Sequence, residues 1–433
     1  MVAESDSVEE ASRGLELTEP GLLPEGWDTA RLGDLLKEVD VRVHEAGIES
    51  APILSMTRHR GLVLQNQKFG KRVASRDIRN YKVVRKGQIV YGFPMDEGVI
   101  YSLQDFDVGM VSPVYEIWEP TTEAVHVPFL DKLLRTPSMI ATYRRLTSNT
   151  VQRRRIVSKK DFKAISVPLP PLEEQRAIAH VLSTIQRAIE ATERVIAAAR
   201  EFKRSLMRHL FTYGPVPLAE AERVPLKETE IGPMPEHWEV GVLENHCHKP
   251  QYGYTATASA EPVGPRFLRI TDIQDEGVSW STVPFCKCPD DQFAKHELHA
   301  GDILIARIGA TTGKSYIVPR LESPAIFASY LIRIRARTGI TADFLYRFFN
   351  FGGYWSQVNA SKGDKLKMGV SGSTLAALRI PLAPMREQDN VAQALSTLDR
   401  KIQAEEKRKA ALKELFRTML HLLMTGQIRV KGL

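Results

Sequence analysis

The stretch of the sequence whose residues could most directly do chemistry is Arg307–Ser315, which reads RIGATTGKS. It ends in Gly-Lys-Ser, as does a nucleotide-binding P-loop, whose backbone amides cradle the phosphates of ATP. A P-loop needs four residues between its two glycines, but only three residues separate Gly309 from Gly313. The segment that follows reads as a strand and a turn instead of a helix. The pattern therefore predicts a strand–turn–strand with glycines in the turn.

Two further patterns resemble sites of chemistry but fail in their details. A DNA methyltransferase that acts on an amine needs a polar residue before Pro-Pro and an aromatic residue after it, because these hold and stack on the flipped base. The Pro-Pro pair here lies within Leu169–Leu172, where leucine fills both positions, and it suits the start of a helix. Cys286, Cys288 and the run His246–His248 lack the spacing of a zinc site. We therefore expect no catalytic residue, no cofactor site and no metal site in this chain.

The elements around these motifs form a tandem repeat, which is the first pattern to seek in a long chain. PEGW, ending at Trp27, returns as PEHW, ending at Trp238, at an offset of 211 residues. VPLPPLEEQRAIAHVLSTIQRAIEATE, from Val167, returns as IPLAPMREQDNVAQALSTLDRKIQAEE, from Ile380, at an offset of 213. A fainter pair, KGQIV and AGDIL, lies between them at nearly the same offset. Three pairs in one order predict a duplicated unit of slightly more than 200 residues.

Each unit is predicted to begin with short strands and turns and to end with one long helix. Apolar residues recur every three or four positions from Ile178 to Leu210, and again from Val391 to Leu423, as in an amphipathic helix. A helix over Glu173–Thr212 would be roughly 60 Å long. The simplest partner for an apolar stripe of that length is its own duplicate. Two separate helices, each packed on its own domain, are the alternative.

These patterns predict an α+β protein in seven parts. The parts are a disordered acidic tail at 1–20, a mixed domain at 21–170, a long helix at 171–213, a proline-rich linker at 214–235, a second mixed domain at 236–382, a long helix at 383–426 and a tail at 427–433. The chain has 433 residues, of which 43% are hydrophobic and 26% charged, as in globular proteins. Three cysteines, the lack of a signal-peptide pattern and the lack of a long apolar run predict a cytoplasmic protein without a membrane helix.

Basic residues gather at similar places in the two units, and the net charge is +7. Cations mixed with small polar donors suit the phosphates of DNA, and arginine can also read base edges. We predict DNA contacts at Arg58, Arg60, Lys68, Lys71, Arg72, Arg144, Arg145, Arg153, Arg154, Arg155, Lys159, Lys160, Lys362, Lys365 and Lys367. Arg307 and Lys314, near the ends of the glycine-rich turn, are further candidates for DNA phosphate contact. A solvated basic surface without a ligand is the alternative.

The plan of two mixed domains and two long helices, without a catalytic motif, resembles the specificity subunit of type I restriction–modification systems. PLPPLEEQRAIAHVLSTIQRAIE, Pro168–Glu190, looks like the central conserved region of that family, and Pro381–Ile428 looks like its distal counterpart. FLRITDIQDEG, Phe267–Gly277, and GDILIARIGATTGK, Gly301–Lys314, look like recurrent patches of its target recognition domains. The likeness covers nearly the whole chain after the acidic tail.

The resemblance implies two target recognition domains in tandem pseudo-repeat, joined and spaced by two long antiparallel coiled-coil helices. Each domain would read one half of a bipartite site in double-stranded DNA, and the helices would set the spacer. Two methyltransferase subunits would dock on the helices and bring S-adenosylmethionine. Two motor–nuclease subunits, which use ATP and Mg²⁺, could join for restriction. The chain itself would be a non-enzymatic subunit with no cofactor and no membrane contact.

Two other hypotheses stay open at the level of sequence. One is a nucleotide-dependent enzyme built on Gly309–Ser315. The other is a coiled-coil scaffold that does not bind DNA and whose basic residues serve solubility. Loss of ATP binding in Lys314→Ala would favour the first hypothesis. Failure to bind DNA at any salt concentration, with the partner present, would favour the second.

Overall fold

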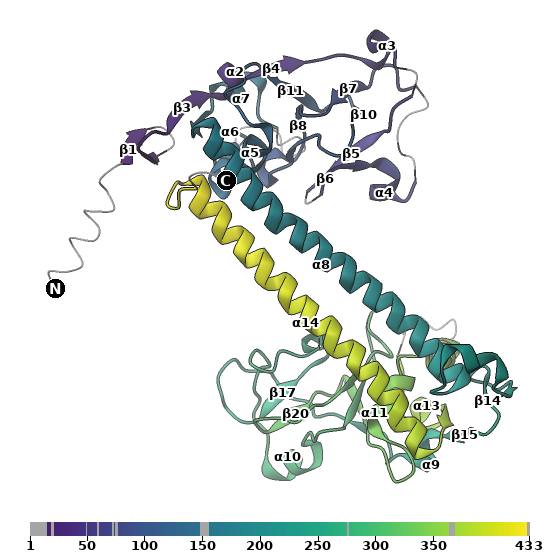
Figure 1. Cartoon of the computed structure of the whole chain (residues 1–433). Helices are drawn as coiled ribbons and strands as arrows, with labels where there is room; N and C mark the ends of the chain where they lie inside the picture. The colour runs from purple at the N-terminus through teal and green to yellow at the C-terminus, as the bar shows by residue number, and fades with distance from the viewer. Residues whose placement is uncertain are drawn as a thin grey trace. The chain divides into compact units, whose positions relative to one another are not determined.

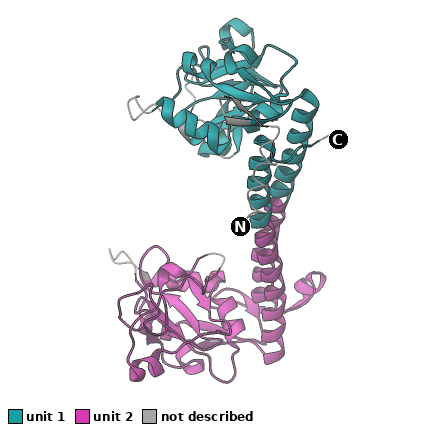
Figure 2. Cartoon of the chain, turned by 90° about the vertical axis from the view of Figure 1, so that its left-hand side faces the viewer, with its two compact units in different colours: residues 1–191, 409–433 teal, residues 192–408 magenta. Residues whose placement is uncertain are grey.

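The computed structural model describes residues 15–18, 21–48, 50–58, 60–71, 73, 77–147, 156–274, 277–362 and 369–430. The chain divides into two units, which Figure 2 shows in different colours. Unit 1 consists of residues 1–191 and 409–433, and unit 2 consists of residues 192–408. Unit 1 is therefore assembled from both ends of the sequence.

Unit 1 contains a four-stranded antiparallel sheet in the order β4-β11-β8-β9. The strands of the unit are β1 (Leu15–Thr18), β2 (Gly21–Pro24), β3 (Asp28–Arg31), β4 (Leu36–Val39), β5 (Leu54–Thr57), β6 (Gly61–Leu64), β7 (Lys82–Arg85), β8 (Ile89–Tyr91), β9 (Ile100–Ser102), β10 (Val108–Val111), β11 (Glu116–Pro120) and β12 (Ser166–Leu169). Its shorter helices are α2 (Leu32–Leu35), α3 (Val43–Ala46), α4 (Gln65–Phe69), η1 (Met95–Glu97), α5 (Val127–Leu133), α6 (Pro137–Thr147) and α7 (Lys159–Ala164), many of which are labelled in Figure 1.

Unit 2 contains a four-stranded antiparallel sheet in the order β16-β21-β18-β19. Its strands are β13 (Leu226–Lys227), β14 (Met234–Pro235), β15 (Glu239–Val242), β16 (Gln251–Tyr252), β17 (Arg266–Leu268), β18 (Ile303–Ala306), β19 (Ser315–Ile317), β20 (Ala325–Phe327), β21 (Leu331–Ile334) and β22 (Arg379–Leu382). Its shorter helices are η2 (Leu218–Arg223), α9 (Leu243–His246), η3 (Ile270–Asp272), α10 (Asp290–His296), α11 (Ala342–Phe348), α12 (Gly352–Lys362) and α13 (Gly372–Ala376). No helix in the described ranges is long and apolar enough to cross a membrane.

The two sheets have the same topology, which confirms the tandem repeat and the mixed α+β fold. Numbered along the chain, the strands of each sheet lie in the order 1-4-2-3. The antiparallel pair β3–β12 in unit 1 likewise recurs as β15–β22 in unit 2. The units differ outside these elements. Unit 1 has the hairpin β5–β6 followed by α4, whereas unit 2 has the parallel pair β17–β20 and α10.

Two long helices pass from one unit into the other along the chain. Helix α8, Leu172–Tyr213, has 42 residues, and α14, Met385–Met424, has 40 residues. Proline at the start and Glu173–Glu174 in the first turn suit the N-terminus of α8, because carboxylates stabilise that end of a helix. Gly214 and Gly426 follow the helices with φ of 79° and 68°, the left-handed conformation that commonly ends a helix.

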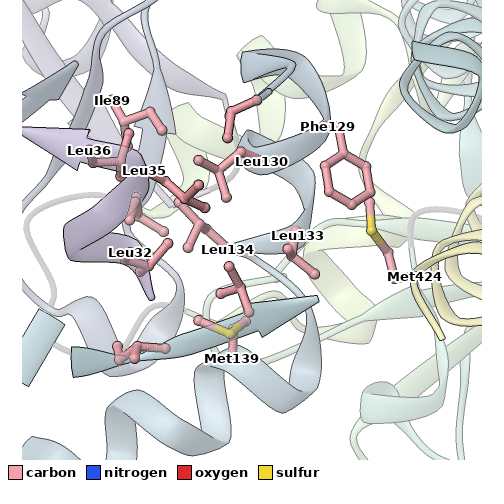
Figure 3. Close-up of a cluster of buried hydrophobic side chains, with 14 of the residues drawn as sticks. Leu32, Leu35, Leu36, Ile89, Phe129, Leu130, Leu133, Leu134, Met139 and Met424 are labelled. Carbon is pink, nitrogen blue, oxygen red and sulfur yellow. The ribbon is translucent and has the colours of Figure 1, made fainter. Parts of the chain in front are cut away.

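The cores of both units show that these helices run antiparallel. In unit 1 the beginning of α8, with Ile178 and Leu182, shares a core with the end of α14, where Met424 lies near Phe129 in Figure 3. In unit 2 the end of α8, with Leu210, shares a core with the beginning of α14, with Leu395. The alternative of two helices that each pack only on their own domain is therefore wrong.

The most similar residues of the repeat anchor the long helices to the mixed domains. Gln175 of α8 is fully buried and accepts a hydrogen bond from the amide of His126 at 2.8 Å. Its side-chain amide donates to the carbonyls of Ala124 and Pro170 at 2.9 and 2.8 Å. The side-chain amide of this glutamine therefore satisfies one donor and two acceptors of the neighbouring backbone where the helix begins.

The same contacts recur at the beginning of α14. Gln388 accepts from the amide of Thr341 at 2.8 Å and donates to the carbonyls of Gly339 and Ala383 at 3.0 and 2.8 Å. The offset of 213 residues between the two glutamines is the offset of the sequence repeat. This part of the repeat therefore corresponds to the glutamine that anchors each long helix to its mixed domain.

The tryptophans of the repeat meet the glutamates that precede these glutamines. Trp27 donates its indole N–H to Glu174 at 3.1 Å, and Trp238 donates to Glu387 at 2.8 Å. In unit 1, Arg429 also binds Glu174, with Nε at 2.7 Å from Oε1 and Nη2 at 2.8 Å from Oε2. The segment after α14, which was predicted to be a tail, thus supplies a charged partner to the first helix.

The structure differs from the expected structureless tail at residues 1–20. Residues 1–14, 19 and 20 lie outside the described residues, but Leu15–Thr18 forms β1, in which Leu15 pairs with Pro24 of β2. In unit 2, Leu226 of β13 pairs with Pro235 of β14, at the same offset of 211 residues. LELTEPGLLPEGW returns as LKETEIGPMPEHW, so the repeat begins at Leu15, before the Pro-Glu-x-Trp motif. The acidic residues of the first twenty positions led to the prediction of a disordered tail, so this similarity was missed.

Candidate nucleic-acid interface

The glycine-rich stretch is the turn of a β-hairpin between β18 and β19, as predicted. Gly309 and Gly313 have φ of 82° and 92°, a backbone region that favours glycine. Three amides of the turn donate to carbonyls of the same hairpin: Thr312 to Gly309 at 3.1 Å, Gly313 to Ala306 at 2.8 Å and Lys314 to Thr311 at 2.9 Å. Because these amides are already bonded within the hairpin, they do not form the phosphate cradle of a P-loop.

Arg307 is held firmly where β18 meets this turn. Its amide donates to the carbonyl of Tyr330 at 3.0 Å, and its carbonyl accepts from the amide of Val370 at 2.8 Å. Its guanidinium group lies over the ring of Tyr252, 4.8 Å from the ring centroid. The hydroxyl of Tyr252 accepts from the amide of Gly372 at 2.8 Å, so the ring itself is fixed. The arginine thus has a preorganised backbone and a stacked side chain.

The other basic candidates of unit 2 are less well defined. Lys314 is half-buried at the far end of the same turn. Lys362 is the last residue of α12. Lys365 and Lys367 lie outside the described residues. Of the predicted contacts in unit 2, the structure therefore brings together Arg307 and Lys314, which are joined through the hairpin.

Unit 1 gathers its first basic cluster on the hairpin β5–β6 and the helix after it. Arg58 and Arg60 lie at the exposed turn of the hairpin, and Lys71 follows α4. Lys68 of α4 reaches back to the carbonyl of Met56 in β5 at 2.8 Å. Arg58 also lies 3.3 Å from the carboxylate of Glu97 in η1. Arg72 lies outside the described residues.

The second basic cluster of unit 1 is divided between α6 and α7. Arg144 and Arg145 are exposed near the end of α6, and Lys160 is exposed in α7. The ammonium group of Lys159 instead pairs with Glu38 and, at 3.2 Å, with Glu116. Arg153, Arg154 and Arg155 lie outside the described residues.

Lys159 is the candidate whose surroundings argue most strongly for a structural role. Its hydrogen bond to Glu38 raises the pKa of its ammonium group, so the charge is retained but shared with a carboxylate. The nearly buried Lys82 binds the same Glu116 at 3.0 Å. A lysine whose charge is matched within the protein releases few counterions on DNA, since phosphate would have to displace its carboxylate partners.

Three exposed aromatic residues near these clusters were missed by the search for charge. Phe93, directly after β8 and Gly92, is 47% exposed, and Tyr252 and Tyr330 beside Arg307 are 40% and 53% exposed. Aromatic side chains are enriched at binding interfaces relative to the rest of a protein surface. For Phe93 the sequence did hold a signal, the fainter repeat pair KGQIV and AGDIL. At its offset of 214 residues, Phe93 is the residue equivalent to Arg307.

Two of the three cysteines are fully buried. Burial raises the pKa of the thiols of Cys247 and Cys286 to about 12 and about 11. The described residues contain no group of three or more metal-binding side chains, histidine included. The expectation that the chain has no metal site stays a prediction.

Comparisons with known proteins find one family of similar chains. A family model described as the type I restriction modification DNA specificity domain matches residues 137–199 and 290–414. The type I restriction enzyme MjaVIII specificity subunit of Methanocaldococcus jannaschii is 30% identical over 289 residues, which are 64% of this chain and 65% of that subunit. The putative MjaX specificity subunit of the same organism is 24% identical over 432 residues, with 96% of each chain covered.

The chain is similar to type I restriction enzyme specificity subunits in sequence and in fold. The aligned part spans slightly less than two thirds of the MjaVIII subunit but nearly all of the MjaX subunit. Among solved structures, the type I restriction–modification S subunit from M. genitalium has a TM-score of 0.58 at 14% identity, covers 95% of this chain and is itself 98% covered. A second, from a study of the type I R-M system, has a TM-score of 0.51 at 20% identity. These two likenesses concern the fold of the specificity subunit.

Neither competing sequence hypothesis is supported for this chain. The hairpin that contains Gly309–Ser315 lacks the loop length and the following helix of a P-loop. The family model is a DNA specificity domain, and it covers parts of both units, so a scaffold without DNA specificity is not supported either.

Proposed function

We propose that the chain reads DNA as the specificity subunit of a type I restriction–modification complex. The observation that carries this proposal is the pair of domains with the same 1-4-2-3 sheet but different surrounding elements. A repeated scaffold with divergent surfaces suits a bipartite DNA site whose two halves differ in sequence. Each domain reads one half-site, and the chain contributes recognition instead of catalysis.

The basic clusters supply the sequence-independent part of DNA binding. Arg58, Arg60 and Lys68 lie together in unit 1, and Arg307 lies in a fixed hairpin of unit 2. Contacts from such residues to phosphates position a protein on DNA, and base contacts then specify the sequence. Clusters in both units support binding of each domain to its own segment of double-stranded DNA.

The long helices dock the partner subunits. Val195 and Phe202 of α8 are seven residues apart, which places them on one face, and they are 42% and 57% exposed. Leu415 of α14 is 46% exposed. We take the pair Val195 and Phe202 on one helix face as the support for docking of other chains, because phenylalanine is enriched at protein–protein interfaces. We assign these sites to two methyltransferase subunits, which bring S-adenosylmethionine, while motor–nuclease subunits that use ATP and Mg²⁺ add restriction. The complex acts in the cytoplasm.

A methylation map of DNA tests this function directly. The chain is expressed with its cognate methyltransferase subunit, and modified bases are mapped across a genome. The expected result is methylation at one bipartite motif with a fixed spacer, which disappears when this chain is omitted. Methylation that is unchanged without the chain would refute the proposal.

The role of α8 and α14 in setting the spacer has its own test. Seven residues inserted into each helix preserve the apolar stripe and add about 10 Å of helix. Because base pairs of DNA are spaced by about 3.4 Å, we expect the spacer to widen by about three base pairs. A control protein that carries substitutions in both helices but no inserted residues should keep the original spacer. An unaltered spacer in the lengthened protein would mean that the helices do not measure it.

Removal of single charges separates DNA contacts from structural ion pairs. Lys160→Ala should reduce the salt dependence of DNA binding by about one counterion. Lys159→Ala should leave that slope unchanged, because its charge is matched by Glu38 and Glu116. The slope is measured by titrating DNA binding at several salt concentrations. Equal reductions in both variants would contradict this assignment.

A further inference from the structure

One position after the buried second strand of each sheet is equivalent in the two units but differs in chemistry. Gly92 donates its amide to the carbonyl of Val99 at 3.2 Å, and Ala306 donates to the carbonyl of Lys314 at 2.9 Å, which are matching contacts of the two hairpins. The next residue is Phe93 in unit 1 and Arg307 in unit 2. The strands that lead to this position are buried throughout in both units. The scaffold is therefore kept while one side chain changes.

The faces of the two strands agree with this equivalence. Ile89 and Tyr91 of β8 lie in one core cluster with α8, whereas Val90 lies in another. Ile303 and Ile305 of β18 likewise share a core with α8, whereas their neighbour Leu304 faces another cluster. A shift by one residue would exchange the two faces of a strand. Because the faces of β8 and β18 alternate in the same way, Phe93 of unit 1 and Arg307 of unit 2 occupy equivalent positions of the repeat.

Phe93 lies just before a segment of unit 1 that contacts two basic elements. The helix η1 begins two residues later, at Met95, and its Glu97 lies 3.3 Å from Arg58 on the β5–β6 turn. The next residue, Gly98, lies against Ile140 of α6, the helix that carries Arg144 and Arg145. An apolar ring that is 47% exposed near basic segments is suited to touch a base while those segments contact phosphates.

The guanidinium group of Arg307 is fixed in place but weakly bonded. Its Nη1 lies 3.5 Å from the carbonyl of Ser329, a weak contact, and its buried Nε has no acceptor among the described residues. No carboxylate in the described part of the chain pairs with it, and the group lies over the ring of Tyr252. A guanidinium group carries five N–H donors in a rigid fork, four of them on its two terminal nitrogens. Those terminal N–H groups could bind a ligand with two adjacent acceptors.

We propose that this position determines sequence specificity, with Arg307 reading a guanine in the half-site of unit 2 and Phe93 contacting a thymine methyl group in the half-site of unit 1. The inference rests on the proposed DNA-reading function. In the major groove, guanine presents O6 and N7 as adjacent acceptors, which arginine binds bidentately, and thymine presents a methyl group to apolar side chains. The difference between the two units at one equivalent position would then be a difference between two half-sites.

Base analogues test the guanine contact with the protein unaltered. In the motif found by methylation mapping, each guanine is replaced in turn by 7-deazaguanine, which lacks N7, or by inosine, which keeps N7 and O6. We expect one 7-deazaguanine in one half-site to weaken binding of the complete complex roughly tenfold to hundredfold, while inosine there has little effect. The Arg307→Met complex should not distinguish guanine from 7-deazaguanine at that base.

The variants also assign the half-sites. Arg307→Met should relax the preference for one guanine in the methylation map, and Phe93→Ala should relax a thymine in the other half. A lack of any 7-deazaguanine effect in the native complex, or full discrimination by Arg307→Met, would overturn the inference. So would an equal loss of affinity for all sequences with a reduced salt slope, since that is the behaviour of a phosphate contact. If the native complex shows no bipartite motif, the proposed function itself fails.

The inference can still be tested if the Arg307→Met variant fails to fold. Thermal unfolding of the Arg307→Met complex is compared with that of Lys314→Met, a control at the other end of the same turn. If Arg307→Met does not fold, the analogue series on the native complex decides alone. A guanine that is sensitive to 7-deaza substitution supports the inference only where inosine is tolerated, and sensitivity to inosine alone points to the minor groove and contradicts it.

Discussion

Replacement of Gln388 by alanine should sharply destabilise the junction between α14 and unit 2. The side chain is fully buried and makes three hydrogen bonds with backbone, to the amide of Thr341 and to the carbonyls of Gly339 and Ala383. Alanine leaves one amide and two carbonyls without their partner. Since each unsatisfied buried group costs about 1–3 kcal/mol, we expect a loss of about 3–5 kcal/mol. That is a large share of the total stability of a domain.

Amide hydrogen exchange measures this loss at the site itself. A loss of about 3 kcal/mol in the local opening free energy corresponds to roughly a hundredfold faster exchange at Thr341, since 1.4 kcal/mol is tenfold. Chemical denaturation followed by tryptophan fluorescence gives the loss for the whole unit. Gln393→Ala, on the exposed face of the same helix, should change stability by less than about 0.5 kcal/mol.

Because the two units repeat the same contact, the equivalent substitution in unit 1 gives an independent test. Gln175→Ala should accelerate exchange at the amide of His126, its partner in unit 1, and leave Thr341 protected. A destabilisation by Gln388→Ala of less than about 1 kcal/mol, or unchanged exchange at Thr341, would refute the view that these glutamines anchor the long helices.

Two other predictions concern the ion pair between Arg429 and Glu174, called here the clasp on Glu174, and the cysteine thiols. Arg429→Met should lower the free energy of unfolding by about 1.5–3 kcal/mol, because a nearly buried carboxylate loses a paired cation. Arg417→Met, which breaks an exposed ion pair, should cost at most about 1 kcal/mol in the same denaturation assay, and equal losses would contradict the clasp. In native protein at pH 8, a thiol reagent should modify the half-buried Cys288 first. Burial raises the pKa of Cys247 to about 12, so its thiol stays protonated, and equally fast labelling of Cys247 would contradict its burial.

Much of the fold followed from the sequence because the duplication repeats its most constrained positions. The run from Val167 and its copy from Ile380 predicted both long helices, and the structure begins and ends them within two residues of the expected bounds. Their pairing followed from the length of the apolar stripes, since a long stripe needs a partner along its length. The glutamines stood out as repeated residues, but their contacts with backbone required the folded chain.

The candidate interface was harder to predict because charge alone does not reveal its partners. Lys159 looked like the other lysines of its cluster, yet it binds Glu38, which lies 121 positions away in the sequence. Arg307 was predicted as a DNA phosphate contact from its place beside a glycine-rich turn, but its contacts with Tyr252, Ser329 and Tyr330 come from distant strands and turns that the sequence did not reveal. Phe93 was missed because an isolated aromatic residue is ordinarily expected in a core. Long-range contacts therefore separate structural cations from candidates for reading DNA.

The discontinuous composition of unit 1 has a consequence for its synthesis. Its core contains Leu423 and Met424, and Arg429 completes the contacts of Glu174. The ribosome makes the mixed domain of unit 1 first but reaches residues 409–433 only after all of unit 2. At about 5–20 residues per second, the first unit waits some tens of seconds for its closing segment. A nonsense mutation or a proteolytic cut near the C-terminus would therefore expose the core of the domain nearest the N-terminus, so the oldest part of the nascent chain is the last to be finished.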